Sequence, residues 1–461
     1  MYMKIDRTIF KAYDIRGRYP EQLTPDLAYH IGRAISTYLV PNRVVIGRDM
    51  RISSDLMYKE LISGFLKSTS KVIDIGLTST DVFYHACADS KSPGVMVTAS
   101  HNPPNHGGFK IVKELPYVLG QKDGLEEISE LILTENYLDV ATEGEVVRAD
   151  FSQSFVNKMF SLVAPESIKP MKIIADSGNG MAGPILGKVY DCLPQIDLIH
   201  INQKLDGVSP THGWDPLKPE NHYQLQQKVI DEGADLGFAF DGDGDRFFVI
   251  DDRGQILAGD FLTSILSRYF LKKNPYSKII YDVRSSSAIP DQVKMLNGIP
   301  IQERVGHSFI KKRMFEENAV FGGELTGHYY FRDFYFSDTA MLPSLILLKI
   351  LSDLNAPLSS LAVELEKKYF LSGEINIPVK DKSQIKIKLQ ELENLFAKDA
   401  KIERIDGVSI IFNDWRFNLR PSNTEALLRL NLEANSQSIL EEKLEFVVNG
   451  FLNKEELVSS V

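Results

Sequence analysis

Apolar residues recur along the chain in short runs, separated by longer stretches with helical spacing. Short strands are predicted at residues 44–46, 72–75 and 95–97, and again at 172–175, 278–281 and 319–321. Alternation of strands and helices is typical of α/β layers with mixed or parallel sheets. The chain up to about residue 369 is therefore expected to hold several α/β modules in succession.

The remaining residues follow a different pattern. A charged helical stretch at 383–398 precedes strand-like segments at 408–412 and 427–432, and a final helix closes the chain. Strands with helices on one face predict a small α+β domain. Because 461 residues exceed what one hydrophobic core usually serves, the length predicts about three or four domains. The pattern of elements places boundaries near residues 148, 252 and 369, which gives the ranges 1–148, 149–252, 253–369 and 370–461.

The composition is that of an ordinary globular protein, with 43% apolar and 25% charged residues. Sixty-two acidic against 52 basic residues give a net charge of -10. This balance argues against a protein that coats nucleic acid or binds a membrane surface through basic residues. An anionic small substrate remains compatible with it, provided that cations gather in one site.

Cysteine usage and targeting signals point to a reducing compartment. The two cysteines, Cys87 and Cys192, form neither a disulfide framework nor a zinc-ligand spacing. The N-terminus carries charges where a signal peptide needs an apolar stretch, and the longest apolar run, 341–350, is too short for a membrane span. We expect a cytoplasmic protein.

The first chemical signal is the sequence TASHNPP at residues 98–104. A predicted strand, 94–98, delivers Ser100 to a turn that two prolines restrict. A serine hydroxyl is a poor nucleophile unless a base or cation assists it, and His101 and Lys110 are the local candidates. Lys110 can shuttle a proton where its pKa is lowered. Gly107 and Gly108 are predicted to let backbone approach a ligand. Taken alone, the segment also fits a polar turn.

The strongest single motif is the loop DGDGDR, which lies between predicted strands 236–240 and 247–250. Asp241, Asp243 and Asp245 alternate with glycines and can converge on one hard cation. Three carboxylates this close repel one another unless a metal neutralises them. The loop is therefore predicted to bind Mg²⁺ and to leave room for a phosphate oxygen.

Two alternatives to this magnesium site are an EF-hand and an acidic hairpin turn. An EF-hand needs glycine at its sixth position and glutamate at its twelfth, where this chain has Arg246 and Asp252. A hairpin turn also favours Asp and Gly, but rarely needs three aspartates and an arginine.

Glycines at 178, 180 and 183 match the spacing of a dinucleotide-binding fingerprint. That fingerprint also wants an acidic residue at the end of the next strand, where this chain has Asn202 and Gln203. Tight packing between a strand and a helix is the interpretation that we favour for these glycines.

Several further segments carry groups suited to a phosphorylated sugar. Glu324 and Thr326 can accept hydrogen bonds from sugar hydroxyls, and His307 begins a predicted helix. The segment RPSNT is a candidate phosphate clamp formed by Arg420, Ser422, Asn423 and Thr424. Tyr13 and Arg16 follow a short apolar element near the N-terminus. Each segment taken alone also fits a turn or a structural residue.

Taken together, the motifs resemble those of the α-D-phosphohexomutase family, most closely its phosphomannomutase/phosphoglucomutase branch. They follow the family's order along nearly the whole chain: AYDIRG, GRDMR, TASHNPP, DPLKPEN, DGDGDR, VGHSFIK, GGELTGH and RPSNTE. The resemblance implies three related α/β modules with mixed sheets and a smaller C-terminal α+β domain, arranged around a central cleft.

The resemblance also implies roles for individual residues. Ser100 would carry the phosphate as phosphoserine, and it would join Asp241, Asp243 and Asp245 around Mg²⁺. Glu324 and Thr326 would bind sugar hydroxyls. The second phosphate would bind at Arg420, Ser422, Asn423 and Thr424. Lys110 and His307 match positions for proton transfer, while Arg16, His101 and Arg246 line the serine site. Tyr13 and Arg284 are further candidate contacts to the substrate, although lysine is expected at position 284 in this branch.

The implied reaction interconverts mannose 6-phosphate and mannose 1-phosphate through a bound hexose 1,6-bisphosphate, which also serves as activator. Glucose phosphates are expected as further substrates. The alternatives are phosphoglucomutase as the main activity, a metal-dependent phosphosugar phosphatase, and a calcium-binding protein without enzymatic activity. A monomer is the family default, with a dimer as the alternative.

Overall fold

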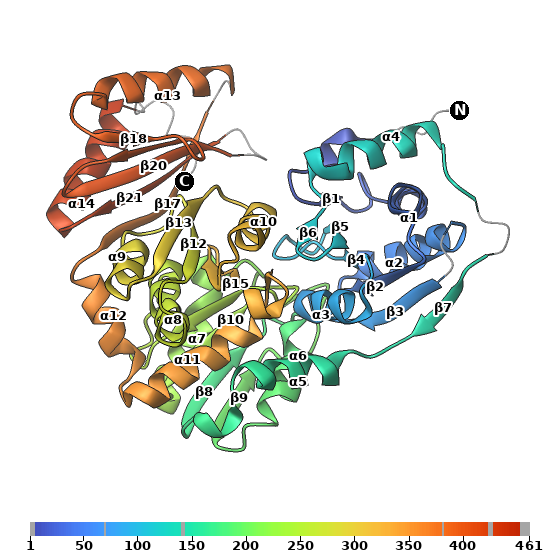
Figure 1. Ribbon diagram of the computed structural model, residues 1–461, viewed down its shortest axis with the longest axis horizontal. Helices are drawn as coiled ribbons and strands as arrows, with labels where there is room; N and C mark the ends of the chain where they lie inside the picture. Colours follow the sequence, from blue (N-terminus) through green and yellow to red (C-terminus); the bar gives the residue numbers. More distant parts are fainter. Residues whose placement is uncertain (1–4, 69–70, 140–142, 380–381, 423–426, 452–461) are drawn as a thin grey trace.

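The computed structural model describes residues 5–68, 71–139, 143–379, 382–422 and 427–451. They form four β-sheets, and each sheet lies within one of the four predicted residue ranges (Figure 1). The first three sheets are mixed and the fourth is entirely antiparallel. The predicted fold class is confirmed, while the boundaries at 148, 252 and 369 stay predictions.

The first sheet has the strand order β1-β5-β4-β2-β3-β7, with β6 paired to β5. Its strands are β1 (Ile15–Arg18), β2 (Arg43–Arg48), β3 (Lys71–Leu77), β4 (Gly94–Val97), β5 (His106–Glu114), β6 (Tyr117–Val118) and β7 (Glu145–Arg148). Its helices are α1 (Pro25–Leu39), α2 (Ile52–Leu66), α3 (Thr80–Ser90) and α4 (Glu126–Thr134). Parallel β2, β3 and β4 end at one edge, which is where ligands usually bind in such sheets.

The second sheet has the order β11-β10-β8-β9. Its elements are α5 (Ser152–Leu162), β8 (Met171–Asp176), α6 (Ala182–Tyr190), β9 (Ile196–Ile201), α7 (Tyr223–Glu232), β10 (Leu236–Phe240) and β11 (Phe247–Ile250). The hairpin from β10 to β11 contains the aspartate loop, so this loop projects from the end of a fully buried strand pair.

The third sheet has the order β13-β12-β14-β15-β16. Its strands are β12 (Lys278–Asp282), β13 (Ile299–Glu303), β14 (Phe321–Gly323), β15 (Tyr329–Phe331) and β16 (Ser337–Asp338). Its helices are α8 (Gly259–Lys273), α9 (Ala288–Met295), α10 (His307–Glu317), α11 (Met341–Leu354) and α12 (Leu358–Glu366). One continuous cluster of buried apolar side chains joins this domain to the second, so the two pack as one body.

The fourth sheet has the order β17-β21-β20-β19-β18 and a core of its own. Its elements are β17 (Phe370–Pro378), α13 (Lys382–Phe396), β18 (Lys401–Glu403), β19 (Val408–Ile411), β20 (Trp415–Pro421), β21 (Leu427–Ala434) and α14 (Gln437–Glu445). Polar contacts tie it to the third domain: Arg416 donates to the carbonyl of Ser285 at 2.7 Å, and Glu433 accepts from the amide of Ser287. Polar interfaces of this kind permit relative domain motion.

None of the helices in the described residues has both the length and the apolar composition of a membrane span. α11 and α12 reach them only when taken together, across a bend of 93°.

Candidate active site

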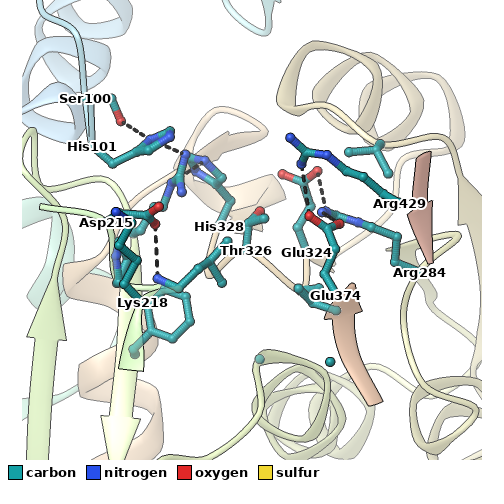
Figure 2. A pocket seen from close by; sticks show the side chains of 18 of the residues that line it. Ser100, His101, Asp215, Lys218, Arg284, Glu324, Thr326, His328, Glu374 and Arg429 are labelled. Atoms are coloured by element: carbon teal, nitrogen blue, oxygen red, sulfur yellow. Dashed lines mark hydrogen bonds and ion pairs between the residues drawn. The ribbon is translucent and has the colours of Figure 1, made fainter. Parts of the chain in front are cut away.

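A cavity of about 1550 Å³ lies where the four domains meet. Figure 2 shows Ser100 and His101 on one wall, Glu374, Arg284 and Arg429 on the opposite wall, and Thr326 between them. The other predicted residues that line it are Tyr13, Arg16, Lys110, Arg246, His307, Glu324, Arg420 and Ser422. Side chains from segments more than 400 residues apart in the sequence therefore line the same cavity. The predicted residues Asn423 and Thr424 lie outside the described residues.

Ser100 lies three residues beyond β4 in a left-handed conformation, with φ of 50°. Its side chain is buried, and Oγ donates a hydrogen bond to Oδ2 of Asp241 at 3.0 Å. The Nδ1 atom of His101 lies 3.4 Å from the same Oγ. Non-glycine residues held at positive φ often belong to functional sites. The serine loop is thus in direct contact with the aspartate loop of the second domain.

Arg51 holds the backbone of the serine loop in place. The sequence analysis did not predict this role. Its guanidinium donates to the carbonyls of Ser100 and Asn102, both at 2.6 Å, and to that of Pro103 at 2.7 Å. Nε of Arg51 pairs with Asp49, and the guanidinium stacks on Trp214 of the second domain, 4.4 Å from the ring centre. The motif GRDMR was the available signal, but nothing local assigns Arg51 to a loop fifty residues away.

Arg51→Lys is expected to lower the free energy of unfolding by about 3 kcal/mol. A lysine ammonium cannot make the several hydrogen bonds of the Arg51 guanidinium, and it pairs less well with the buried carboxylate of Asp49. Any activity that uses the Ser100 hydroxyl is also expected to fall, since the Ser100 backbone loses its support. Denaturation followed by tryptophan fluorescence checks the first effect. Arg48→Lys, in the same motif but partly exposed, is the control and should change stability by less than about 0.5 kcal/mol. Equal losses in the two variants would contradict this role.

The aspartate loop brings its three carboxylates together. One oxygen from each of Asp241, Asp243 and Asp245 lies within 4.8 Å of the others, and all three side chains are buried. Oδ1 of Asp243 and of Asp245 have no hydrogen-bond partner among the described residues. Buried carboxylate oxygens without partners are costly, and such a set matches the ligands that Mg²⁺ prefers. The residues present therefore fit a divalent cation.

Close backbone packing seats the aspartate loop. A side chain at Gly242 would place its Cβ 2.7 Å from the carbonyl oxygen of Ser100, and one at Gly180 would lie 2.8 Å from that of Gly242. The amide of Met181 donates to the same Gly242 carbonyl. Gly180 is therefore tightly packed against the aspartate loop, whereas Gly183 packs against the carbonyl of Gln203, 2.8 Å from its Cβ position, beyond the end of β9.

Lys110 lies between two of the aspartates, with Nζ 2.7 Å from Asp243 and 2.5 Å from Asp245. Burial acts to lower the pKa of Lys110, but the two carboxylates outweigh it and the pKa is raised. The lowered pKa that proton transfer to a neutral Lys110 would require is therefore not met in the arrangement described. Burial raises the pKa of Asp241, and repulsion from Asp243 and Asp245 raises it further. The Lys110 ammonium and the Arg246 guanidinium, 3.6 Å from Asp241, together leave the three carboxylates one positive charge short, which again favours a bound cation.

Thr80 links the first domain to this loop and was not predicted. At the start of α3, its hydroxyl donates to Oδ2 of Asp243 at 2.6 Å, and its amide donates to the carbonyl of the same residue at 2.9 Å. Thr80 therefore fixes both the backbone and the side chain of Asp243.

The interpretation of Gly107 and Gly108 as points of ligand approach was wrong. Both lie within β5, and a Cβ at Gly108 would lie 2.5 Å from the carbonyl oxygen of Ile15 and 2.8 Å from that of Thr98. A Cβ at Gly107 would meet the methyl group of Met57 on α2. These glycines permit close packing within the first domain.

A chain of polar contacts runs from the serine site into the third domain. Arg246 donates to Nε2 of His328 at 3.1 Å and lies 2.9 Å from Nδ1 of His101. His328 is bound through Nδ1 to Asp338, which also pairs with the fully buried Lys311 at 2.6 Å. Because Arg246 can only donate, Nε2 of His328 accepts, so Nδ1 carries the hydrogen toward Asp338. His328 lies in the motif GGELTGH but had no predicted role.

The remaining predicted residues surround these contacts. Arg16 donates to the side chain of Asn102 at 2.8 Å and pairs with Asp14, so it lies beside the serine loop. The hydroxyl of Tyr13 donates to the carbonyl of Val305, and its ring centre lies 5.6 Å from that of His307. Burial lowers the pKa of His307 well below its usual value, with Lys311 adding to the effect, so its imidazole is neutral. Its Nδ1 is buried without a hydrogen-bond partner among the described residues.

The opposite wall carries Glu324 and the arginines. The Glu324 carboxylate accepts from the amide of Gly306 at 3.1 Å and from the hydroxyl of Tyr330 at 2.7 Å, which fixes its orientation at the cavity. Arg284 binds Asp282 through two nitrogens and lies 3.9 Å from Glu324. Arg420, buried at the edge of β20, contacts Glu374 at 3.3 Å. A fixed carboxylate and several guanidiniums thus lie side by side, across the cavity from Ser100.

Family models match the chain in four consecutive parts. They are described as phosphoglucomutase/phosphomannomutase domain I at residues 7–138, domain II at 149–254, domain III at 258–369 and the C-terminal domain at 374–449.

Individual relatives match over nearly their full length. A phosphomannomutase of Escherichia coli is 36% identical over 93% of this chain and 95% of its own, and a protein of Xanthomonas campestris named phosphohexose mutases is 37% identical over 94% and 96%. Among solved structures, a phosphoglucomutase/phosphomannomutase family protein of Burkholderia thailandensis superposes with a TM-score of 0.86 at 30% identity, over 96% and 98% of the two chains. The chain therefore belongs to the phosphoglucomutase/phosphomannomutase family and is an enzyme of the isomerase class.

Proposed function

We propose that this enzyme interconverts mannose 6-phosphate and mannose 1-phosphate, with glucose phosphates as further substrates. One observation carries the proposal. The Ser100 hydroxyl contacts the aspartate loop at one end of the cavity, and buried arginines with a fixed carboxylate lie at the other. Such a cavity suits a ligand with a phosphate at one end and hydroxyls or a second phosphate at the other.

The proposed cycle begins with phosphate carried on Ser100. A sugar hydroxyl attacks the phosphorus and the bond to Ser100 Oγ breaks. The hydroxyl proton passes to a neutral base such as His307, and the departing Ser100 oxygen takes a proton from an acid such as Lys110. The resulting hexose 1,6-bisphosphate turns end for end and returns its other phosphate to Ser100, so that atoms balance over the cycle. The same bisphosphate, supplied in traces, would load the enzyme as activator.

The side chains along the cavity divide these tasks. Lys110, Arg16, His101 and Arg246 would place positive charge and hydrogen bonds around the transferred phosphate. Glu324 and Thr326 would bind sugar hydroxyls in either orientation. Arg420, Ser422, Asn423 and Thr424 would hold the phosphate that does not react, with Tyr13 and Arg284 nearby. Glu324 suits both orientations because a single carboxylate accepts two adjacent hydroxyls.

Asp241, Asp243 and Asp245 would hold Mg²⁺ together with an oxygen on Ser100. Mg²⁺ supplies neutralising charge for a phosphoserine, which carries about -1.5 to -2 near neutral pH. We further propose a cytoplasmic enzyme that acts as a monomer, the family default. Closure of the fourth domain over the cavity would keep water from the phosphoserine.

A coupled assay with mannose 1-phosphate and glucose 1-phosphate, with and without the 1,6-bisphosphate, tests this proposal. A mutase conserves the phosphate ester and accelerates when the bisphosphate is added. Release of inorganic phosphate in amounts equal to substrate consumed would indicate a phosphatase instead. Faster turnover of glucose 1-phosphate would make phosphoglucomutase the main activity.

A further inference from the structure

Glu374 lies where the chain enters the fourth domain, at an irregular point of β17. The pairing of β17 with β21 shifts register between Leu371 and Glu374, and Gly373 adopts φ of 69° within the shift. Bulges bend a strand and redirect side chains, often beside active sites. The irregularity here immediately precedes a residue whose carboxylate lines the cavity.

Three arginines surround this carboxylate. Its oxygens lie 3.0 Å from Arg429 and 3.4 Å from Arg284 (Figure 2). Arg420 lies 3.3 Å from the same carboxylate. Burial acts to raise the pKa of Glu374, but the arginines outweigh it and the pKa is lowered, so the group is ionised. A carboxylate held by several guanidiniums presents the same charge and the same hydrogen-bond acceptors as a phosphate would.

The arginines differ in their other partners. Arg284 is already bound by Asp282 through two nitrogens. Arg420 is 3% exposed, and in the described part of the chain its only carboxylate contact is Glu374. Its Nε is buried with no hydrogen-bond partner in that part of the chain. The positive charge of Arg420 is therefore balanced there by Glu374, and its buried Nε–H still lacks an acceptor.

A second side chain at this wall also lacks partners. Asn431 on β21 is 7% exposed and lines the cavity, and both polar atoms of its amide are buried without a hydrogen-bond partner among the described residues. Buried amides are costly when unpaired. Asn431 and Arg420 together indicate that this wall is built to receive a polar, anionic ligand beyond Glu374.

We propose that the Glu374 carboxylate takes the place of the substrate's phosphate between Arg284, Arg420 and Arg429. It holds these arginines in position when no phosphate is bound, and it weakens their binding of the phosphate when the substrate is present. The inference rests on the proposed function for the identity of the ligand. Its physical basis is repulsion, because a fixed anion beside the same guanidiniums opposes an incoming dianion. An intermediate that must turn end for end cannot be held too tightly at either phosphate.

Glu374→Gln, which keeps the shape and removes the charge, tests the proposal. Inorganic phosphate is expected to bind the variant roughly tenfold more tightly than it binds the wild type, as measured by calorimetry. The KM for mannose 1-phosphate is expected to decrease correspondingly. kcat should fall as well, because the bisphosphate is released and reoriented more slowly. If Glu374 only positions the arginines, phosphate should bind more weakly to Glu374→Gln, since glutamine would hold the arginines less firmly.

Three further variants make the result specific. Glu374→Asp, which keeps the charge, should bind phosphate as the wild type does. Glu442→Gln removes one charge from the exposed face of α14 and should change nothing. Arg420→Gln in the Glu374→Gln background should abolish the gain, because the effect is assigned to that guanidinium.

Phosphate binding needs no turnover, which separates this inference from the proposed function. Tighter phosphate binding in Glu374→Gln, in a protein that has no mutase activity, would count against the proposed function and support the role of Glu374. Unchanged or weaker phosphate binding in Glu374→Gln would overturn the inference, even in an active mutase.

Discussion

Ser100→Ala is expected to abolish mutase turnover, with a loss of at least about 10³-fold in kcat, while sugar phosphates still bind within a few-fold of the wild-type affinity. The reason is that Oγ would carry the phosphate and has no substitute. Its loss removes a hydrogen bond to Asp241 and the nearby contact with His101, but leaves Glu324 and the arginines unchanged. The coupled assay and calorimetry measure the two effects separately.

The backbone at this position complicates the substitution little, because serine and alanine bear a similar cost at φ of 50°. Ser92→Ala provides a matched control, since this buried serine of the same domain donates only to a neighbouring carbonyl away from the cavity. Incubation with the bisphosphate followed by mass spectrometry should show a phosphate adduct in wild type and in Ser92→Ala, but not in Ser100→Ala. Near-normal turnover of Ser100→Ala would refute the assignment.

Asp241→Asn is expected to leave the metal-free protein folded and at least as stable as the wild type, while it weakens metal binding. Because burial and two neighbouring carboxylates raise the pKa of Asp241, its ionised form costs stability in the metal-free protein above the ordinary pKa of an aspartate. The neutral amide removes that cost, and its oxygen can still accept from the loop amides that Asp241 now binds. The thermal midpoint without metal should therefore equal or exceed that of wild type.

Magnesium should reverse the order of the two proteins. At about one hundred times its Kd, Mg²⁺ would stabilise the wild type by about 2.7 kcal/mol, whereas Asp241→Asn should gain little at the same concentration and lose at least about 10²-fold in activity. Thermal unfolding with and without Mg²⁺ measures this, with Asp231→Asn on the exposed face of α7 as the control for a lost charge. Stabilisation of Asp241→Asn by Mg²⁺ equal to that of wild type would argue against a metal at this loop.

The sequence by itself determined the fold class and the family, and it supplied the candidate site residues. Strand and helix periodicities are local, and alternate aspartates in a tight turn can point to one side whatever surrounds them. The serine turn, the aspartate loop and the order of the motifs along the chain therefore predicted the candidate residues and the family.

Only the tertiary structure decided how these groups act on one another. Ser100 meets Asp241 across 141 residues, and Lys110 is held by carboxylates that raise its pKa. Thr80, Arg51, His328 and Glu374 gain their importance only from contacts made through space. Electrostatic energies depend on the distances between groups and on their burial rather than on their spacing in the sequence. The sequence therefore could not predict these interactions.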